Sequence, residues 1–214
     1  MAKVERLKIW ETLFQRALVL VDEARSSGIP VDEWTFGGGT VLMRRHYHRF
    51  SKDVDIFIND RQFIGYLSPR LSATAESLTR DYVEDHDFVK LIFPEGEIDF
   101  VASGPLTEES AVSEQLFGRD ILVENSSEIV AKKVWYRGEQ FTARDIFDLA
   151  MVAEKEPDTL NKISQILRSR RDMVLARIEK HGARLREDFQ SLEVLSYSRT
   201  FEECVDTVRA TLSR

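Results

Sequence analysis

A glycine-rich turn followed by two nearby aspartates is the feature that most constrains this chain of 214 residues. The glycines occupy positions 37–39, and the aspartates are Asp53 and Asp55, separated by one valine. The apolar run at 54–58 predicts a strand, in which residues two apart point to the same face, so both carboxylates should project together. Two such charges repel by roughly 4 kcal/mol at 4 Å and an effective dielectric near 20. The pair therefore favours a cation site, and its oxygen ligands suit a hard ion such as Mg²⁺.

The residues around the glycines predict a strand, a turn and a helix in succession. Residues 34–36 form a short strand, and Thr40 is expected to cap a helix that continues to Arg45. Free N–H groups at such a helix start can hold a phosphate. The alternative is a tight turn without a ligand, because the segment lacks the Gly-Lys-Ser/Thr ending of a P-loop and the spacing of a dinucleotide fold.

A third carboxylate, Asp99, lies inside an apolar segment. Residues 88–93 and 98–101 predict two strands of a hairpin, joined by the polar residues 94–97. Aspartate is depleted from strands, and its burial is costly without a partner. Asp99 is therefore either a third acid facing Asp53 and Asp55 or an edge residue that points to water.

The order of elements predicts a mixed α/β first part and a helical second part. A helix is expected over 4–24, a helical region from 59 that is interrupted at 68–69 and resumes over 71–81, and a last strand over 119–123. Helices follow over 126–136, 143–153, from 157, over 168–185 and over 200–212. We expect two domains, an α/β domain at 1–125 and a helical domain at 126–214.

Charge is unevenly distributed along a chain whose net charge is −7. Residues 162–186 hold eight basic and two acidic side chains, so this segment either contacts phosphates or forms a solvated helix face. The composition is ordinary for a soluble globular protein. The chain contains no apolar run of the ~20 residues needed to span a membrane, and its first residues predict an amphipathic helix and not a signal peptide, so we expect a cytoplasmic protein. The single cysteine, Cys204, cannot form an internal disulfide.

Several motifs occur together in an order that resembles the AbiEii/AbiGii abortive-infection nucleotidyltransferases over residues 34–150. They are Gly38-Gly39-Thr40, His48-Arg49-Phe50-Ser51-Lys52-Asp53-Val54-Asp55, Ile98-Asp99-Phe100, Ile129-Val130-Ala131-Lys132-Lys133, Arg137 and Arg144-Asp145-Ile146-Phe147-Asp148-Leu149. The resemblance implies an α+β fold of the DNA-polymerase-β-like nucleotidyltransferases, with a mixed sheet flanked by helices and a C-terminal helical region. It also implies an enzyme that is often the toxin of a toxin–antitoxin pair.

The resemblance further implies roles for individual residues. Two Mg²⁺ ions would be held by Asp53, Asp55 and Asp99, and Asp99 would also be the candidate base. A nucleoside triphosphate would be bound by residues from both parts of the chain: Gly38, Gly39, Thr40, Ser51, Lys133 and Arg137. The frame of the motif favours Lys133 over Lys132.

Two aspartates and two histidines near these motifs allow more than one interpretation. Asp145 either contacts the nucleotide or orients the lysine through a salt bridge, and it is included among the catalytic candidates. Alternatively, Asp145 and Asp148 form a structural network with Arg144. His46 and His48 fit a turn or a substrate contact better than a zinc site, since there is no third spaced ligand.

The expected reaction moves a nucleoside monophosphate from the triphosphate to an acceptor. By analogy with the family, RNA is the expected acceptor, most plausibly the 3′ end of tRNA, and a cognate antitoxin is a possible partner. The alternatives are transfer to a protein hydroxyl or a small molecule, and a non-catalytic scaffold that binds a partner. For catalysis, Lys133 is expected to lie across a cleft from Asp53.

Overall fold

The computed structural model describes residues 3–213, and the chain divides into two compact units that alternate along the sequence. Unit 1 contains the residues up to Val41 together with 51–105 and 111–124, and unit 2 contains 42–50, 106–110 and 125–214. Two short segments that precede residue 125 therefore belong with the C-terminal helices. The expected domain boundary at 125 stays a prediction.

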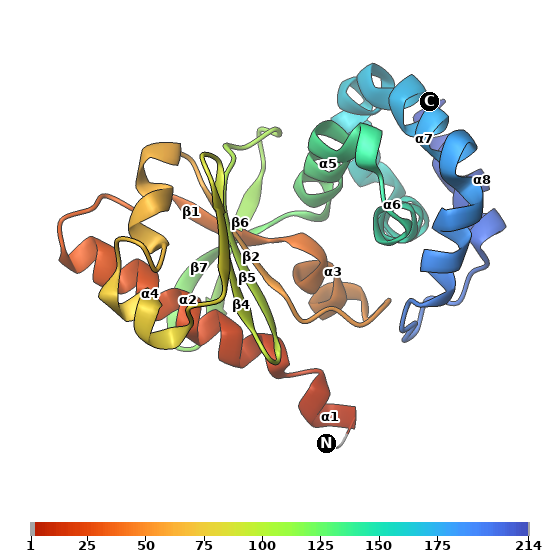
Figure 1. Cartoon of the computed structure of the whole chain (residues 1–214). Coiled ribbons are helices and arrows are strands. Elements are labelled where there is room, and N and C mark those ends of the chain that lie inside the picture. The colour runs from red at the N-terminus through yellow and green to blue at the C-terminus, as the bar shows by residue number, and fades with distance from the viewer. Residues whose placement is uncertain (1–2, 214) are drawn as a thin grey trace. The chain divides into compact units, whose positions relative to one another are not determined.

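Unit 1 is built on a seven-stranded mixed sheet with the order β3-β4-β5-β2-β1-β7-β6 (Figure 1). Two neighbouring pairs, β2 with β5 and β1 with β7, are parallel, and the other pairs are antiparallel. The strands are β1 (Trp34–Gly37), β2 (Val54–Ile58), β3 (Tyr82–Asp85), β4 (Phe88–Phe93), β5 (Gly96–Ala102), β6 (Ala111–Leu116) and β7 (Arg119–Glu124). The expected α+β fold with a mixed sheet is confirmed.

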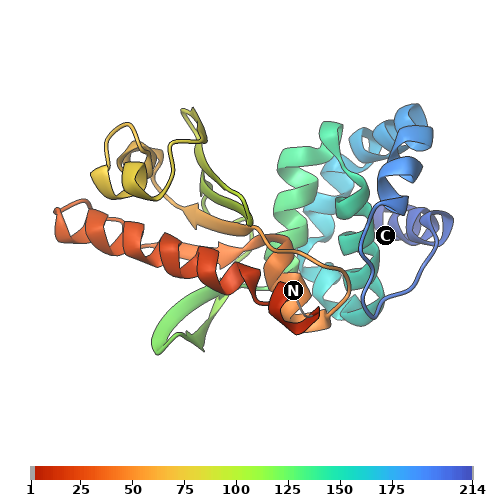
Figure 2. The ribbon, with the colours of Figure 1, turned by 60° about the horizontal axis from the view of Figure 1, so that its bottom comes forward.

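Helices cover one face of this sheet. Helix α2 (Ile9–Ser26) packs against β5 and β2, and η1 (Arg61–Leu67) packs beside it on β4 and β5 (Figure 2). The other helices are α1 (Lys3–Arg6), α4 (Ala73–Leu78) and α3 (Gly38–His46), whose residues from Leu42 onward count with unit 2. Strand residues alternate between buried and half-buried positions, so the apolar side chains of β2, β4 and β5 face these helices.

An aromatic cluster joins α2 to the sheet. Phe14 is fully buried, and its ring centroid lies 4.5 Å from that of Phe36 on β1. Trp10, one helical turn before Phe14, stacks on Phe36 with centroids 5.8 Å apart. The amphipathic pattern that predicted this helix thus supplies the largest buried rings of unit 1.

Unit 2 is helical, with α6 (Ala143–Lys155) in contact with α5, α7 and α8 (Figure 1). The elements are α5 (Ser126–Arg137), η2 (Gly138–Gln140), η3 (Pro157–Ile163), α7 (Ser164–Gln190) and α8 (Phe201–Leu212). The segment at 47–50 joins this unit through backbone hydrogen bonds, in which the N–H groups of Leu195 and Ser196 donate to His48 and Tyr47 at 2.9 Å each. Helix α6 is therefore the core of unit 2.

Four local predictions differ from the structure. Helix α3 begins at Gly38, so Thr40 lies inside it and is not its cap. The helix expected over 71–81 ends at Leu78, and β3 and β6 were not predicted. Both are edge strands with half-exposed sequences that contain polar residues, and such strands lack the apolar alternation that marks a buried strand. Helix α7 extends beyond the expected 168–185 at both ends, and non-helical dihedrals at His181 divide it by a kink.

None of the helices in the described part of the chain is long and apolar enough to cross a membrane.

The buried position of Phe14 gives a direct test of the packing in unit 1. Phe14→Ala should lower the free energy of unfolding by about 3–5 kcal/mol, since the ring leaves a cavity against Phe36. Val19→Ala on the same helix is the control, because Val19 is 51% exposed and should change stability by no more than about 0.5 kcal/mol. Urea unfolding followed by circular dichroism measures both. Equal losses in the two variants would contradict the described packing of α2.

Candidate active site

The glycine turn of unit 1 lies directly against one of the predicted carboxylates. Gly38 follows β1 with a φ of +74°, a left-handed conformation that disfavours side chains. A Cβ atom at Gly38 would lie 1.9 Å from Oδ2 of Asp55, far inside contact distance. A glycine at position 38 is therefore required both by the backbone conformation and by the adjacent Asp55 carboxylate.

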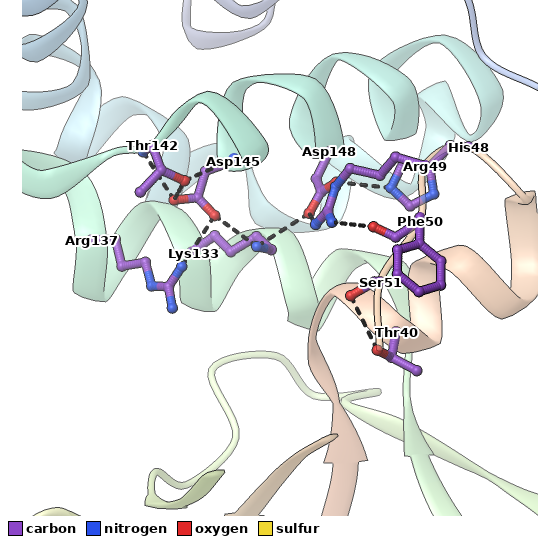
Figure 3. A network of polar contacts seen from close by, with 10 residues as sticks. All are labelled: Thr40, His48, Arg49, Phe50, Ser51, Lys133, Arg137, Thr142, Asp145 and Asp148. Atoms are coloured by element: carbon purple, nitrogen blue, oxygen red, sulfur yellow. Dashed lines mark hydrogen bonds and ion pairs between the residues drawn. The ribbon is translucent and has the colours of Figure 1, made fainter. Parts of the chain in front are cut away.

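Thr40 connects the start of α3 to the segment that precedes β2. Its buried hydroxyl donates to the backbone oxygen of Asp53 at 2.6 Å and accepts from the hydroxyl of Ser51, whose Oγ atom lies 3.1 Å away; the contact with Ser51 is drawn in Figure 3. These bonds hold the Asp53 backbone against the helix that carries the glycine turn. The nucleotide contacts expected of Gly38, Gly39, Thr40 and Ser51 stay predictions.

Asp55 and Asp99 lie side by side on neighbouring strands. They are register partners in the parallel pairing of β2 and β5. Asp53, just before β2, accepts the backbone N–H of Glu97 on Oδ1 at 3.1 Å. Because β5 pairs with β2 on one side and β4 on the other, Asp99 is not on an edge strand, and its side chain is only 19% exposed. The edge interpretation of Asp99 is therefore wrong.

The surroundings of Asp99 disfavour its charge unless a cation is near. Burial raises the pKa of Asp99 to about 7, and the negative charge of Asp55 adds to the effect. Lys90 on β4 opposes both, with its Nζ atom 3.2 Å from Oδ2 of Asp99. The other carboxylate oxygen, Oδ1, is buried and has no hydrogen-bond partner among residues 3–213. An acceptor oxygen in this position suits a bound cation.

The residues of this face have the donor chemistry of a hard-cation site. Within residues 3–213, no three His, Cys, Asp or Glu side chains are grouped closely enough to be ligands of one ion. Asp55, Asp99 and Asp53 nevertheless offer only oxygen donors, and Oδ1 of Asp99 is available as an acceptor. Oxygen donors of this type fit Mg²⁺ better than a transition metal.

A second cluster, in unit 2, is centred on Lys133. Its Nζ atom lies 2.6 Å from Oδ1 of Asp145 and 3.2 Å from Oδ2 of Asp148 (Figure 3). Arg137, one turn further along α5, approaches Oδ1 of Asp145 at 3.5 Å. Lys132 instead points to Glu128 on its own helix, at 3.5 Å. Lys133 is thus the lysine that meets the aspartates of α6.

Asp145 combines a structural role with its ion pair. It completes the capping box at the start of α6, where its Oδ2 accepts the backbone N–H of Thr142 at 3.1 Å and the Thr142 hydroxyl at 2.8 Å. Burial by itself would raise the pKa of this carboxyl, but Lys133 and Arg137 outweigh burial and lower it. An ionised Asp145 therefore orients Lys133.

Asp148 is held by an arginine that the sequence did not indicate. Arg49 donates from Nε to Oδ1 and from Nη2 to Oδ2 of Asp148, both at 2.7 Å, and His48 Nε2 lies 2.8 Å from Oδ1 (Figure 3). Arg144 is exposed, whereas Asp148 is fully buried, so the expected network with Arg144 is replaced by one with Arg49. Burial opposes the charge, but Arg49 and Lys133 hold the pKa of Asp148 well below its usual range.

The predicted residues therefore fall into two groups. Unit 1 contains the glycine turn with Asp53, Asp55 and Asp99, and unit 2 contains Lys133 with its neighbours on α5 and α6. Two features of these groups were not predicted from the sequence. The acidic face also includes Lys90 and Glu97, and Arg49 pairs with Asp148. A basic residue opposite an acid in a predicted hairpin could have indicated Lys90. The placement of Lys133 across a cleft from Asp53 stays a prediction.

Together, the mixed sheet, the glycine turn and the aspartates on β2 and β5 define a nucleotidyltransferase fold. Residues 23–210 match the family described as nucleotidyl transferase AbiEii toxin, Type IV TA system, and the chain belongs to this family. The protein is thus a nucleotidyltransferase of a toxin family. The family resemblance seen in the sequence is confirmed.

Solved structures share this fold at low sequence identity. MenT4, a nucleotidyltransferase toxin from Mycobacterium tuberculosis, is 18% identical with a TM-score of 0.55, and the match covers 100% of this chain and 85% of MenT4. JHP933 from Helicobacter pylori is 14% identical with a TM-score of 0.51, and that match covers 95% of this chain and 90% of JHP933. No curated protein matches the chain.

Gly38 can be tested against a glycine of similar conformation. Gly38→Ala should cost more stability than the roughly 1–2 kcal/mol of a left-handed alanine, because the new Cβ displaces the Asp55 carboxylate. Gly118→Ala is the matched control, since Gly118 has a φ of +75° but open space around its Cβ position. Thermal unfolding and nucleotidyl transfer are measured for both. Equal stability losses and equal activities would disprove the close contact at Asp55.

The low pKa of Asp148 predicts how stability depends on pH. A carboxyl whose pKa is lowered on folding stabilises the protein above its unfolded pKa of about 4, and this stability is lost as pH falls through the folded value. Asp148→Asn should therefore cost about 3–5 kcal/mol at pH 7, where Arg49 is left buried without its counter-charge, and less below pH 4. Urea unfolding at pH 7, 5 and 3.5 measures this.

Asp206→Asn serves as the control for Asp148→Asn. The Asp206 side chain is 77% exposed and lies 3.9 Å from Arg209, so its loss should be nearly neutral at every pH. With the series extended to pH 2.5, closer to the lowered folded pKa, a deficit of Asp148→Asn that stays the same as at pH 7 would show that the carboxylate is not ionised in the folded protein.

Proposed function

We propose that this protein is a Mg²⁺-dependent nucleotidyltransferase that moves a nucleoside monophosphate from a nucleoside triphosphate to RNA, with the 3′ end of tRNA as acceptor. The observation that carries the proposal is the register pairing of Asp55 with Asp99 beside the left-handed turn at Gly38. The family match supports nucleotidyl transfer and a toxin role.

The carboxylates would hold two Mg²⁺ ions through Asp53, Asp55 and Asp99. When bound, such ions supply positive charge at the α-phosphate and at the leaving pyrophosphate. Asp99 would accept the proton of the acceptor hydroxyl as its oxygen forms the new bond to the α-phosphorus and the bond to the pyrophosphate oxygen breaks.

The start of α3 would bind the triphosphate. Backbone N–H groups at Gly38, Gly39 and Thr40 lie at a helix N-terminus, where the helix dipole favours an anion. The absence of a side chain at Gly38 lets the backbone lie against the Asp55 carboxylate. We assign this turn to the β- and γ-phosphates, and Ser51 to a supporting contact.

Lys133 would neutralise negative charge that develops on the nucleotide, with Arg137 beside it. The two buried aspartates fix the direction of the Lys133 side chain, since its Nζ atom lies 2.6 Å from Asp145 and 3.2 Å from Asp148. We therefore assign Lys133 to catalysis and Asp145 to its positioning.

The surface of α7 supports an RNA acceptor. Arg168, Arg171, Lys180 and Arg184 are exposed on this helix, within a segment that has eight basic and two acidic residues. Partial desolvation and then the charges of Arg177, Lys180 and Arg184 lower the pKa of His181, which is consistent with a positive potential along the helix. Such a surface would neutralise backbone phosphates and make binding dependent on salt.

The proposed partners follow from the family and the substrates. A toxin of a toxin–antitoxin pair implies a cognate antitoxin that restrains it. Nucleoside triphosphates and tRNA are found in the cytoplasm, and we place the protein there.

Incubation with each of the four α-labelled triphosphates, Mg²⁺ and total cell lysate tests the function. Label should appear in RNA of tRNA size with the native chain, and Asp55→Asn should reduce transfer by at least about 10²-fold, the usual scale for loss of transition-state charge stabilisation. Label in protein or small molecules would instead support the alternative acceptors. Absence of transfer with all four triphosphates would refute the enzyme proposal.

The lysine assignment is tested with a pair of neighbouring variants. Lys132→Met and Lys133→Met each remove a largely buried ammonium group that pairs with an acid, so both should lower the melting temperature. Only Lys133→Met should abolish transfer when both are assayed below their melting temperatures. Comparable activity of the two variants would remove Lys133 from the mechanism.

A further inference from the structure

A row of residues crosses four strands of unit 1 on the face that carries the carboxylates. Gly37 on β1 pairs with Asp55 on β2, Asp55 pairs with Asp99 on β5, and Asp99 pairs with Lys90 on β4. Each partner is directly opposite the next, and directly opposed side chains interact across strands. Lys90 is thus the next residue in the row that contains the acidic pair.

The ammonium group of Lys90 pairs with two acidic side chains. Its Nζ atom lies 3.2 Å from Oδ2 of Asp99 and also forms a short hydrogen bond to Oε2 of Glu97. The backbone N–H of Glu97 in turn donates to Asp53. Through these contacts one lysine is linked to the segment that bears Asp53 and to the carboxylate of Asp99.

Lys90 contacts only one of the two oxygens of Asp99. The second oxygen, Oδ1, is buried and has no hydrogen-bond partner in the described part of the chain. The side chain of Lys90 is 29% exposed, and a lysine stem has four rotatable bonds, so the ammonium can leave Asp99 without unfolding the strand. An ordinary cross-strand ion pair gives no reason for the second oxygen to be unsatisfied, whereas a position shared with a metal ion does.

We propose that Lys90 is a placeholder cation of the carboxylate site, which positions Asp99 and Glu97 and competes with a divalent ion for Asp99. This inference rests on the proposed function, because it takes Asp99 to be a ligand of that ion. Lys90 acts through Asp99 and is a positioning residue. The positive charge of Lys90 allows Asp55 and Asp99 to remain register partners, and it lowers the affinity of the site for a divalent ion.

The proposal fixes the direction in which a substitution acts. Removal of the lysine charge takes away a repulsion that a divalent ion would meet, so metal affinity should rise. The same change leaves Asp99 and Glu97 without the counter-charge that Lys90 supplies, so stability without a divalent ion should fall. A purely structural ion pair predicts the second effect alone.

The test uses the full chain with Mn²⁺ as the probe, and free Mn²⁺ is measured by electron paramagnetic resonance. Lys90→Met should bind Mn²⁺ about tenfold more tightly than the native chain, because a positive charge within a few ångströms of a divalent ion has been removed. Lys90→Gln, which keeps a hydrogen-bond donor, should show the same direction and covers the case in which Lys90→Met does not fold. Lys90→Arg should restore native affinity.

Two further variants separate this proposal from the proposed function. Arg119→Met removes a cation and its ion pair with Asp22 from the same unit, three strands away from β5, and should leave Mn²⁺ affinity unchanged. Asp55→Asn should abolish Mn²⁺ binding. If native binding depends on Asp55 but both charge-removing variants at Lys90 bind equally or more weakly, the placeholder proposal alone fails. If neither the native chain nor the Lys90 variants bind Mn²⁺, both proposals fail.

Discussion

Repulsion between two carboxylates on adjacent parallel strands is the constraint on which the active-site face of unit 1 depends. The register pairing of β2 and β5 brings Asp55 and Asp99 together, and a one-residue shift would move one of them to the opposite face. This repulsion makes ionisation of Asp99 unfavourable: burial raises the pKa of Asp99, and the negative charge of Asp55 raises it further. Lys90 offsets part of that cost from the next strand. Such a site lowers the stability of the folded protein, as functional sites often do.

In unit 2, the buried acids are paired with basic side chains. Around Asp145 and Asp148, every buried acid is matched by bases at short range: Lys133 bridges both, and Arg49 is bidentate to Asp148. Buried ion pairs are costly to desolvate, but they require a specific geometry. Removal of one member leaves the others buried without a counter-charge. The acids of the unit 1 face, Asp53, Asp55, Asp99 and Glu97, outnumber Lys90, and this excess of negative charge suits a cation. The unit 2 cluster is already neutralised, and it holds one lysine in place.

The sequence was sufficient for the parts of the fold that have strong local patterns. The strand at 54–58, the hairpin around Asp99 and most helices of unit 2 were predicted because apolar periodicity and turn residues agree there. Edge strands β3 and β6 were missed, since their half-exposed faces are polar. The pairing of Arg49 with Asp148 joins residues 99 positions apart, and no local pattern encodes such a contact. Arg144, four residues from Asp148, was the natural but wrong choice from helix spacing alone.

Because Gly38 and Asp55 lie in contact, the residue that can be accepted at one position depends on the residue at the other. The glycine has no room for a side chain largely because the carboxylate occupies it, with Oδ2 1.9 Å from where a Cβ would be. A lineage that lost the acid at position 55 would lose the two closest of these contacts, and the contact with the Cβ atom of residue 55 at 2.9 Å would remain beside the left-handed backbone cost of about 1–2 kcal/mol. Substitutions at the two positions should therefore be non-additive. Inactive descendants of such an enzyme would be expected to show both changes together, so a side chain at position 38 would itself be a mark of lost chemistry.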